Sequence, residues 1–410
     1  MADSYLTERL PGIGGRIKAS AEDFRVEEIP LYPPCGEGEH LYLDVEKTGL
    51  TTFDLLQQLA RAFGVREREL GYAGLKDARA TTRQTISVPG VSAERALAVT
   101  LPGVRILSAR HHRNKLRTGH LAGNRFVIRI REVRPDAAEM ALDILHVLAD
   151  LGVPNRFGPQ RYGVLGNSHL VGRALLRGEY EEGLRQVLGT PEAIGNPRWR
   201  QAAEAFATGD LDGALAALPG RFRDERRMLQ LLQDGSSPRE ALLSLPRKLL
   251  RLYLSAYQAH LFDRLVTMRL DSLGTLWPGD LACKHANGAC FEVIDPAAEQ
   301  PRADAFEISP SAPLFGFKVP LAGGQAGLLE HALLDKERIA LKDFRLGEGL
   351  AMEGERRPLR VPLADFSARQ EGDSLLVQFA LPRGSYATSV LAEVMKSNAV
   401  DSDFAACALA

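Results

Sequence analysis

The chain has 410 residues, of which 45% are hydrophobic and 25% are charged, and its formal net charge is −1. This length and composition predict a folded protein of two or perhaps three domains. A net charge near zero argues against a protein that coats nucleic acid nonspecifically, although it is compatible with a local basic surface. The sequence contains no run of about 18 apolar residues and begins without a secretory-signal pattern, so we expect no membrane span and no secretion.

The N-terminal third alternates like β structure interrupted by one helix. Residues 24–28 (FRVEE) and 40–45 (HLYLDV) have the period of two that is typical of strands. Residues 51–64 predict a helix with Thr51 or Thr52 as the N-cap and Gly64 at the C-cap. The apolar stripe expected on this helix consists of Phe53, Leu56, Leu59, Ala60 and Phe63.

Two further strands and one helix complete this third. Residues 84–88 (QTISV) and 126–131 (FVIRIR) read as strands, and the second alternates apolar with basic residues. A helix is expected from residues 135–136 to about residue 151. One side of it is expected to carry Met140, Ile144, Leu148 and Leu151.

The character of the sequence changes after residue 152. Residues 164–270 are rich in Leu, Ala and Arg and predict several helices, whereas residues 274–330 are rich in Gly and Pro and predict loops. A strand is expected at 374–382, followed by a turn and a helix at 384–396. This order predicts an α+β domain with a second domain inserted into it, and residues 398–410 read as a loose tail.

Cysteine and glycine patterns give little support for a cofactor. The four cysteines are widely scattered, so a disulfide framework is not expected and a reducing, cytoplasmic setting is. Cys283, His285 and Cys290 lie close together, but their spacing differs from a zinc knuckle, and we expect no metal site. The Gly-rich segments 36–40 and 321–327 fit neither the phosphate-loop nor the dinucleotide pattern.

One segment is strongly biased in charge. Residues 105–131 contain eight Lys or Arg residues and no Asp or Glu. A solvated strand edge would explain such a run, but its one-sided charge favours phosphate binding. Lys115 and Arg117 within it are candidate RNA contacts.

A single acid lies in the basic turn GYAGLKDARATTRQ, residues 71–84. On its own, Asp77 is most simply a turn or cap residue. Among Lys76, Arg79 and Arg83, however, its carboxylate should stay ionised, because nearby positive charge favours the charged form. Such a carboxylate can attack an electrophilic carbon or stabilise a developing cation.

The segment GHLAGNRF, residues 119–126, could bind a planar base. The ring of Phe126 could stack on the base while the amide of Asn124 pairs with its edge. The alternative is a turn asparagine followed by the first core residue of a strand, and the residues alone leave both open.

Together these segments resemble the TruD family of tRNA pseudouridine synthases. GYAGLKDARATTRQ is similar to the family's catalytic motif, and the resemblance covers nearly the whole chain in order. The other matching blocks are RIKASAEDFRVEEIP with GEGEHLYLDVEKTG, NKLRTGHLAGNRFVIRIREV, VPNRFGPQRYG (153–163), SAYQAHLFDRLV (255–266) and LPRGSYATSVLAEV (381–394).

The resemblance implies a fold and a set of domains. It implies a pseudouridine-synthase core with a mixed, largely antiparallel sheet flanked by helices, and an inserted α/β domain specific to the family. We therefore expect the core to comprise residues 1–151 and 344–397 and the insertion residues 152–343. Residues 190–246 extend beyond the shortest family members, and residues after 396 match no block of the family.

The resemblance also implies an activity, the isomerisation of uridine to pseudouridine in tRNA, without cofactor or metal. In bacterial members the target is uridine 13 in the D-arm of tRNA(Glu). Carried over by position, Asp77 is the nucleophile. The residues expected to contact the RNA are Phe24, Asn124, Phe126, Tyr386, Lys18, Lys76, Arg79, Lys115 and Arg117, with Tyr386 standing where relatives often have Phe.

Two rival functions remain to be distinguished. A glycoside or nucleoside hydrolase normally needs two carboxylates at a set separation, whereas this motif supplies one. A non-catalytic RNA-binding protein on the same fold would have no need of the acid. No exposed heptad pattern is apparent, so we expect a monomer.

Overall fold

The computed structural model describes residues 4–397 except residue 348. The described chain divides into two compact units, one formed by residues 4–153 and 361–397 and the other by residues 154–360. The second unit is therefore inserted into the sequence of the first, and it includes the strand Glu355–Pro358, which follows the expected boundary at residues 343–344. The tail expected at residues 398–410 lies outside the described residues.

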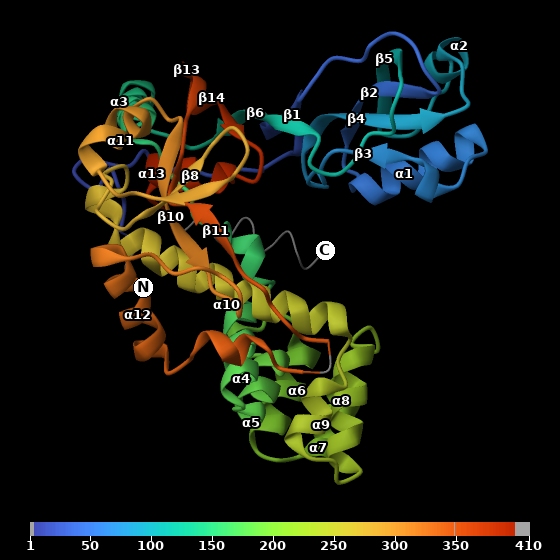
Figure 1. Cartoon of the computed structure of the whole chain (residues 1–410). Helices are drawn as coiled ribbons and strands as arrows, with labels where there is room; N and C mark the ends of the chain where they lie inside the picture. Colours follow the sequence, from blue (N-terminus) through green and yellow to red (C-terminus); the bar gives the residue numbers. More distant parts are fainter. Residues whose placement is uncertain (1–3, 348, 398–410) are drawn as a thin grey trace. The chain divides into compact units, whose positions relative to one another are not determined.

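The first unit is built on an eight-stranded sheet in the order β13-β14-β6-β1-β4-β2-β5, with β3 also pairing with β4 (Figure 1). Only β1 and β4 pair in parallel; the other ladders are antiparallel. The expectation of a mixed, largely antiparallel sheet flanked by helices is confirmed. Its strands are β1 (Phe24–Pro30), β2 (His40–Thr48), β3 (Gly71–Tyr72), β4 (Thr81–Pro89), β5 (Val104–His112), β6 (Leu121–Ile130), β13 (Ala364–Glu371) and β14 (Ser374–Pro382).

Four α-helices accompany this sheet. They are α1 (Thr52–Phe63), α2 (Ala93–Leu97), α3 (Ala137–Leu151) and α13 (Ala387–Met395). Helix α1 begins with a reciprocal capping box between Thr51 and Asp54 and ends at Gly64 in the left-handed conformation, as the sequence predicts. Its apolar face packs on β2 and β4 and forms one core of the unit.

The apolar stripes predicted for α1 and α3 each include one residue that is exposed in the structure. Phe53 is 57% exposed because it lies at the margin of the α1 face, where Leu55 is buried instead. Leu151 is 48% exposed at the C-terminal end of α3, whose buried face includes Ala141 and Leu145. In both helices the buried face is rotated slightly from the stripe that the largest residues suggest.

The second unit is mainly helical, as expected for residues 164–270. The long helix α10 packs along α4, and α5 to α9 pack in a group beside them (Figure 1). The α-helices are α4 (Ser168–Arg177), α5 (Tyr180–Leu188), α6 (Pro197–Ala207), α7 (Leu211–Ala217), α8 (Arg223–Gln233), α9 (Pro238–Leu243), α10 (Arg247–Met268), α11 (Pro296–Asp304) and α12 (Gly324–Glu337).

The expectation of loops at 274–330 was wrong in part, because this region supplies most of a four-stranded sheet in the order β11-β10-β8-β9. Strand β10, ISPSAPL, is buried along its whole length although its prolines and serines are typical of loops. The strands are β8 (Leu281–Lys284), β9 (Cys290–Glu292), β10 (Ile308–Leu314) and β11 (Glu355–Pro358). A separate two-stranded sheet contains β7 (Val153–Pro154) and β12 (Arg360–Val361).

Six short 3-10 helices complete the described elements. They are η1 (Ala21–Asp23), η2 (Glu67–Glu69), η3 (Pro159–Tyr162), η4 (Pro191–Ala193), η5 (Leu270–Ser272) and η6 (Leu341–Phe344). Among the helices of the described residues, none is long and apolar enough to cross a bilayer.

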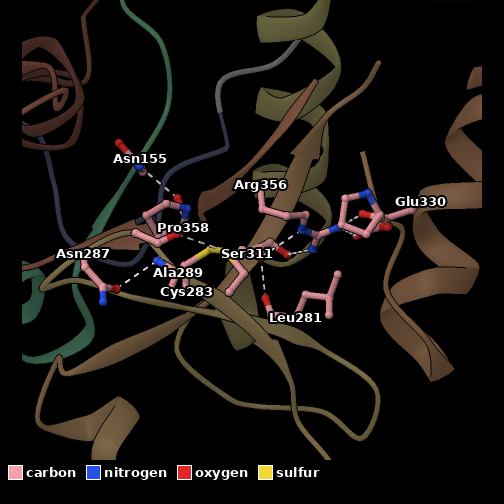
Figure 2. The surroundings of a disulfide bond; sticks show 12 residues. Asn155, Leu281, Cys283, Asn287, Ala289, Ser311, Glu330, Arg356 and Pro358 are labelled. Carbon is pink, nitrogen blue, oxygen red and sulfur yellow. Dashed lines mark hydrogen bonds and ion pairs between the residues drawn. A yellow bond between two sulfur atoms is a disulfide. The ribbon is translucent and has the colours of Figure 1, made fainter. Parts of the chain in front are cut away.

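The β8–β9 hairpin overturns one expectation about the cysteines. Cys283 and Cys290 face each other across the ladder with 4.1 Å between their Cα atoms, and they form a disulfide (Figure 2). In the turn between them the side chain of Asn287 accepts the Ala289 amide at 3.0 Å. Both sulfur atoms are bonded to each other, so neither is available to a metal, and His285 is instead hydrogen-bonded to Ser309 at 2.9 Å.

Candidate active site

Asp77 lies in the loop of residues 73–80 between β3 and β4, which we call the Asp77 loop. Its carboxylate forms an ion pair with Lys18, whose Nζ is 2.5 Å from Oδ2. The Lys18 side chain is only 2% exposed, whereas that of Asp77 is 27% exposed. The ammonium therefore stabilises negative charge on a carboxylate that solvent or a ligand can reach.

The basic neighbours of Asp77 have other partners. The Lys76 ammonium is 3.0 Å from Glu28, and both side chains are nearly buried. Arg83 donates from Nε and Nη2 to both oxygens of Asp44, at 2.5 to 3.0 Å. Lys76 and Arg83, which lie near Asp77 in the sequence, thus pair with carboxylates on neighbouring strands, Glu28 of β1 and Asp44 of β2.

Arg79 contributes through its backbone. Its amide donates to Oδ1 of Asp77 at 3.4 Å, which is a long hydrogen bond within the turn. This contact and the Lys18 ion pair reach different oxygens of the carboxylate. The orientation of the carboxylate is therefore restrained from two sides.

Hydrogen bonds also attach this loop to the start of α1 and to β1. The Lys76 amide donates to the hydroxyl of Thr52 at 2.9 Å, and Thr52 is the first residue of α1. Glu28 accepts both Lys76 and the amide of Thr85, which lies on β4 just beyond the last residue pair of the β1–β4 ladder. Burial raises the pKa of Glu28, and the charge of Lys76 opposes that shift. These anchors were missed from the sequence, because Glu28 reads there as an ordinary strand residue.

Two predicted aromatic residues come together beside Lys18. Phe24 begins β1 and Phe126 lies on β6, and their rings meet edge to face with centroids 6.4 Å apart. The Lys18 Nζ is 4.7 Å from the centre of the Phe24 ring. Phe126 also packs on Phe379 of β14 at 5.4 Å. Phe24 and Phe126 are 4% and 7% exposed, so they form a largely covered apolar wall next to the ion pair.

Asn124 lies on β6, where it pairs with Glu28 of β1 on one side and with Leu381 of β14 on the other. Its side-chain oxygen is buried and has no hydrogen-bond partner among the described residues. Buried polar atoms are nearly always satisfied, so this unpaired amide oxygen requires an explanation such as a bound water or a ligand. The preceding Gly123 is required by close packing, since a Cβ there would lie 2.3 Å from the Leu381 carbonyl.

The C-terminal motif, residues 381–394, is connected to β6, the strand that contains Asn124. β14 pairs with β6 along its length, and the turn after β14 leads to Tyr386 at the N-cap of α13. Arg383 donates to the carbonyl of Gly119 at 2.7 Å. These contacts join residues 381–386 to the segment 119–126 although the two are far apart in the sequence.

The basic run of residues 105–131 is less free than its composition suggests. Its acidic partners come from other segments: Arg105 pairs with Glu46, Arg113 with Glu37, Arg125 with Asp365, Arg129 with Glu371 and Arg131 with Asp23. Within the part of the chain that the structure describes, Arg110, Lys115 and Arg117 have no carboxylate partner. Lys115 binds the carbonyl of Arg68 at 2.6 Å.

The first unit contains a pocket of about 380 Å³, and its lining includes Arg110 and Arg125 of the basic run. Tyr42 and Asp44 in its lining alternate along β2 with Leu43 and Val45, which pack under α1, so the pocket opens on the other face of the sheet. Asp77, Lys18, Phe24, Phe126 and Tyr386 do not line it. It is lined by Glu27, Glu28, Ile29, Pro30, Tyr32, Pro34, Tyr42, Asp44, Arg83, Gln84, Thr85, Ser108, Arg110, Leu116, His120 and Arg125. We therefore place the candidate active site at the Asp77–Lys18 ion pair and not in this pocket.

Comparisons with known proteins agree with one another. The family model described as tRNA pseudouridine synthase D (TruD) matches residues 2–394. A tRNA pseudouridine synthase D from Syntrophotalea carbinolica is 62% identical over 96% of this chain and 99% of its own. One from Geobacter metallireducens is 54% identical over 97% of this chain and 98% of its own. A crystal structure of a TruD protein from Methanosarcina mazei is similar with a TM-score of 0.84 and 27% identity, covering 97% of both chains.

Proposed function

The chain belongs to the tRNA pseudouridine synthase D family, and we therefore propose that it converts uridine 13 in the D-arm of tRNA(Glu) to pseudouridine with Asp77 as the nucleophile. It is a tRNA pseudouridine synthase, and thus an isomerase. The observation that carries the role of Asp77 is its ion pair with a buried lysine beside two phenylalanine rings.

The reaction rearranges one nucleotide without gain or loss of atoms. The C1′–N1 bond of uridine breaks, the uracil turns, and a C1′–C5 bond forms. The proton of C5 leaves and N1 gains one. Because there is no net oxidation, the conversion requires no redox cofactor.

Each site residue has a distinct task in this proposal. The target base must leave its stack, which costs a few kcal/mol. Asp77 assists cleavage of the glycosidic bond, and Lys18 keeps its carboxylate charged and oriented. Phe24 and Phe126 supply apolar surface for the displaced uracil, and the unpaired amide oxygen of Asn124 offers an acceptor for its edge.

Replacement of Asp77 by asparagine tests the chemistry. We expect Asp77→Asn to abolish product formation while tRNA binding changes little, since the amide keeps the size of the side chain. Purified protein is incubated with unmodified tRNA(Glu) transcript, and pseudouridine is mapped by carbodiimide labelling and primer extension. Product formation by Asp77→Asn at the parental rate would remove Asp77 from the reaction.

The same assay tests the substrate. A new stop that reports position 13 in tRNA(Glu), and its absence from a transcript with cytidine at that position, is the expected result. Free uracil in the reaction would instead indicate a hydrolase. Binding without any product, with tRNA(Glu) and with pooled cellular RNA alike, would indicate a non-catalytic RNA-binding protein.

We further propose that the enzyme works in the cytoplasm as a monomer. A single chain contributes all the residues named for the site, and they lie within the unit of residues 4–153 and 361–397. Light scattering coupled to size exclusion should give the mass of one chain, 44.8 kDa. A dimer mass at the concentrations of the assay would contradict this.

A further inference from the structure

A lysine that contacts the Asp77 loop is completely buried. Lys47 lies on β2 and is 0% exposed. Lys47 is two residues beyond Val45 and four beyond Leu43, so it belongs to the same face of the sheet, the one that α1 covers. Lysine is among the residues least often fully buried, because an ammonium loses its hydration there. A strong compensating interaction is therefore expected at its Nζ.

The ammonium of Lys47 binds two backbone carbonyls. It donates to the carbonyl of Leu50 at 2.5 Å and to the carbonyl of Asp77 at 2.9 Å. Leu50 belongs to the turn between β2 and α1, and Asp77 is the proposed nucleophile. One buried cation thus ties the backbone of the catalytic residue to the rigid sheet and to the start of α1.

We propose that Lys47 is a positioning residue, whose ammonium fixes the backbone at Asp77 so that the carboxylate is held in place for the reaction. This inference rests on the proposed role of Asp77. Lys18 donates to the side-chain carboxylate of Asp77, and Lys47 donates to the main-chain carbonyl of Asp77. A displacement of about 1 Å at a reacting group can lower a rate by about 100-fold, so such a double restraint has a direct effect on turnover.

The charges around Lys47 give the proposal a pH dependence. Burial lowers the pKa of Lys47 to about 8; Asp77 and Asp54 oppose this shift and Lys76 adds to it. The ammonium is thus mostly charged at pH 7 and becomes a neutral amine as the pH rises through about 8. A neutral amine makes weaker hydrogen bonds than an ammonium, so the restraint on the loop relaxes at alkaline pH.

The chain offers a matched control for the substitution. Lys396 also donates to two backbone carbonyls, those of Thr7 and Leu10, both at 2.6 Å. Burial lowers its pKa as well. It follows α13, and within the described part of the chain its side chain lies against Thr7, Leu10 and the Tyr5 ring, so Lys396→Met removes the same kind of contact away from Asp77.

The experiment compares Lys47→Met and Lys396→Met in single-turnover reactions on tRNA(Glu) transcript. For Lys47→Met we expect a rate lowered by about 10- to 100-fold. The Kd for tRNA should stay within about twofold of the parental value, and the alkaline decline near pH 8 should be absent. Lys396→Met should keep the parental rate and its pH profile. A folded Lys47→Met protein with the parental rate would overturn the proposal, as would equal losses in both variants.

Two additional results complete the test. If Lys47→Met does not fold, the parental pH profile decides: a rate that falls with an apparent pKa near 8 supports the proposal, and a constant rate from pH 7 to 9.5 overturns it. Asp77→Asn is measured in parallel. An active Asp77→Asn protein refutes the proposed nucleophile itself, whereas an inactive one with an unaffected Lys47→Met refutes only the role of Lys47.

Discussion

The buried ion pair between Glu28 and Lys76 predicts a large and specific loss of stability. The two side chains are 2% and 5% exposed, and their charged atoms are 3.0 Å apart. In Lys76→Met the carboxylate of Glu28 keeps the Thr85 amide as a donor but loses its counter-charge. Removing one partner of a buried pair costs about 3–5 kcal/mol, because the other charge remains buried and uncompensated.

The double variant should recover most of that loss. In Glu28→Gln with Lys76→Met, the glutamine oxygen can still accept the Thr85 amide, and no charge is left in the site. Replacing both members of a buried pair is often close to neutral. We therefore expect the double variant to be at least about 2 kcal/mol more stable than Lys76→Met alone. Arg105→Met serves as the control, since Arg105 is 76% exposed in its pair with Glu46 and should cost at most about 1 kcal/mol.

The assay must separate the two units. Trp199 and Trp277 both lie in the unit of residues 154–360, so tryptophan fluorescence follows that unit. Hydrogen exchange of peptides covering β4 (Thr81–Pro89) follows the sheet that contains the ion pair. Lys76→Met should accelerate exchange in β4 while the fluorescence transition stays within about 1 °C of the parental one. The reasoning would be refuted by a cost below about 1 kcal/mol, or by a double variant no more stable than the single one.

Two other predictions concern residues in different parts of the chain. Burial raises the pKa of Asp263 to about 7 from 3.8, so the folded state binds a proton there that the unfolded state does not. Asp263 therefore contributes up to about 1.4 kcal/mol of stability per unit as the pH falls from 7 toward 5, whereas His169 and His260, whose pKa values burial lowers to about 4, contribute in the opposite direction. Asp263→Asn should remove the Asp263 contribution, so in fluorescence-detected melting the variant should lose stability relative to the parental protein as the pH falls, and an unchanged slope would contradict the assignment. Arg117 is exposed and has no carboxylate partner among the described residues, so Arg117→Ala should weaken tRNA binding and reduce its salt slope by about one. Arg105→Ala, which removes a cation already paired with Glu46, should change that slope less, and equal effects would argue against selective phosphate contact.

Much of the fold could be predicted from local patterns. The strand at 374–382 has the expected bounds, and the caps of α1 appear where Thr51 and Gly64 predicted them. Periodicity failed at β10 (Ile308–Leu314), because a strand buried on both faces does not alternate and its prolines suggest a loop. It failed again for the hairpin of β8 and β9, whose pairing of Cys283 with Cys290 depends on chain reversal and not on local composition.

Part of the candidate site could also be predicted from the sequence, because some of its residues lie in recognisable motifs and others do not. Family motifs point to Asp77, Phe24 and Phe126, and the structure brings these residues near Lys18. Lys47 has no local signal, since one lysine at the end of an alternating strand resembles any solvated residue. Lys47 is buried because the Asp77 loop and the turn before α1 cover this end of β2, an arrangement that depends on the tertiary fold and on no local spacing rule.

The order of the strands helps to explain why Asp77 pairs with Lys18, which is distant in the sequence, although basic residues lie beside it. β1 lies between β6 and β4 and pairs in parallel with β4, so it joins the part of the sheet that contains β2 and β5 to the part that contains β14. Lys18 and Phe24 are carried on the segment that enters β1, while Glu28 extends from the same strand to Lys76. Of the basic residues near Asp77 in the sequence, Lys76 is occupied by Glu28 of β1 and Arg83 by Asp44 of β2. The ion pair of Asp77 with Lys18 therefore joins the segment that enters β1 to the loop that precedes β4, the strand that pairs in parallel with β1.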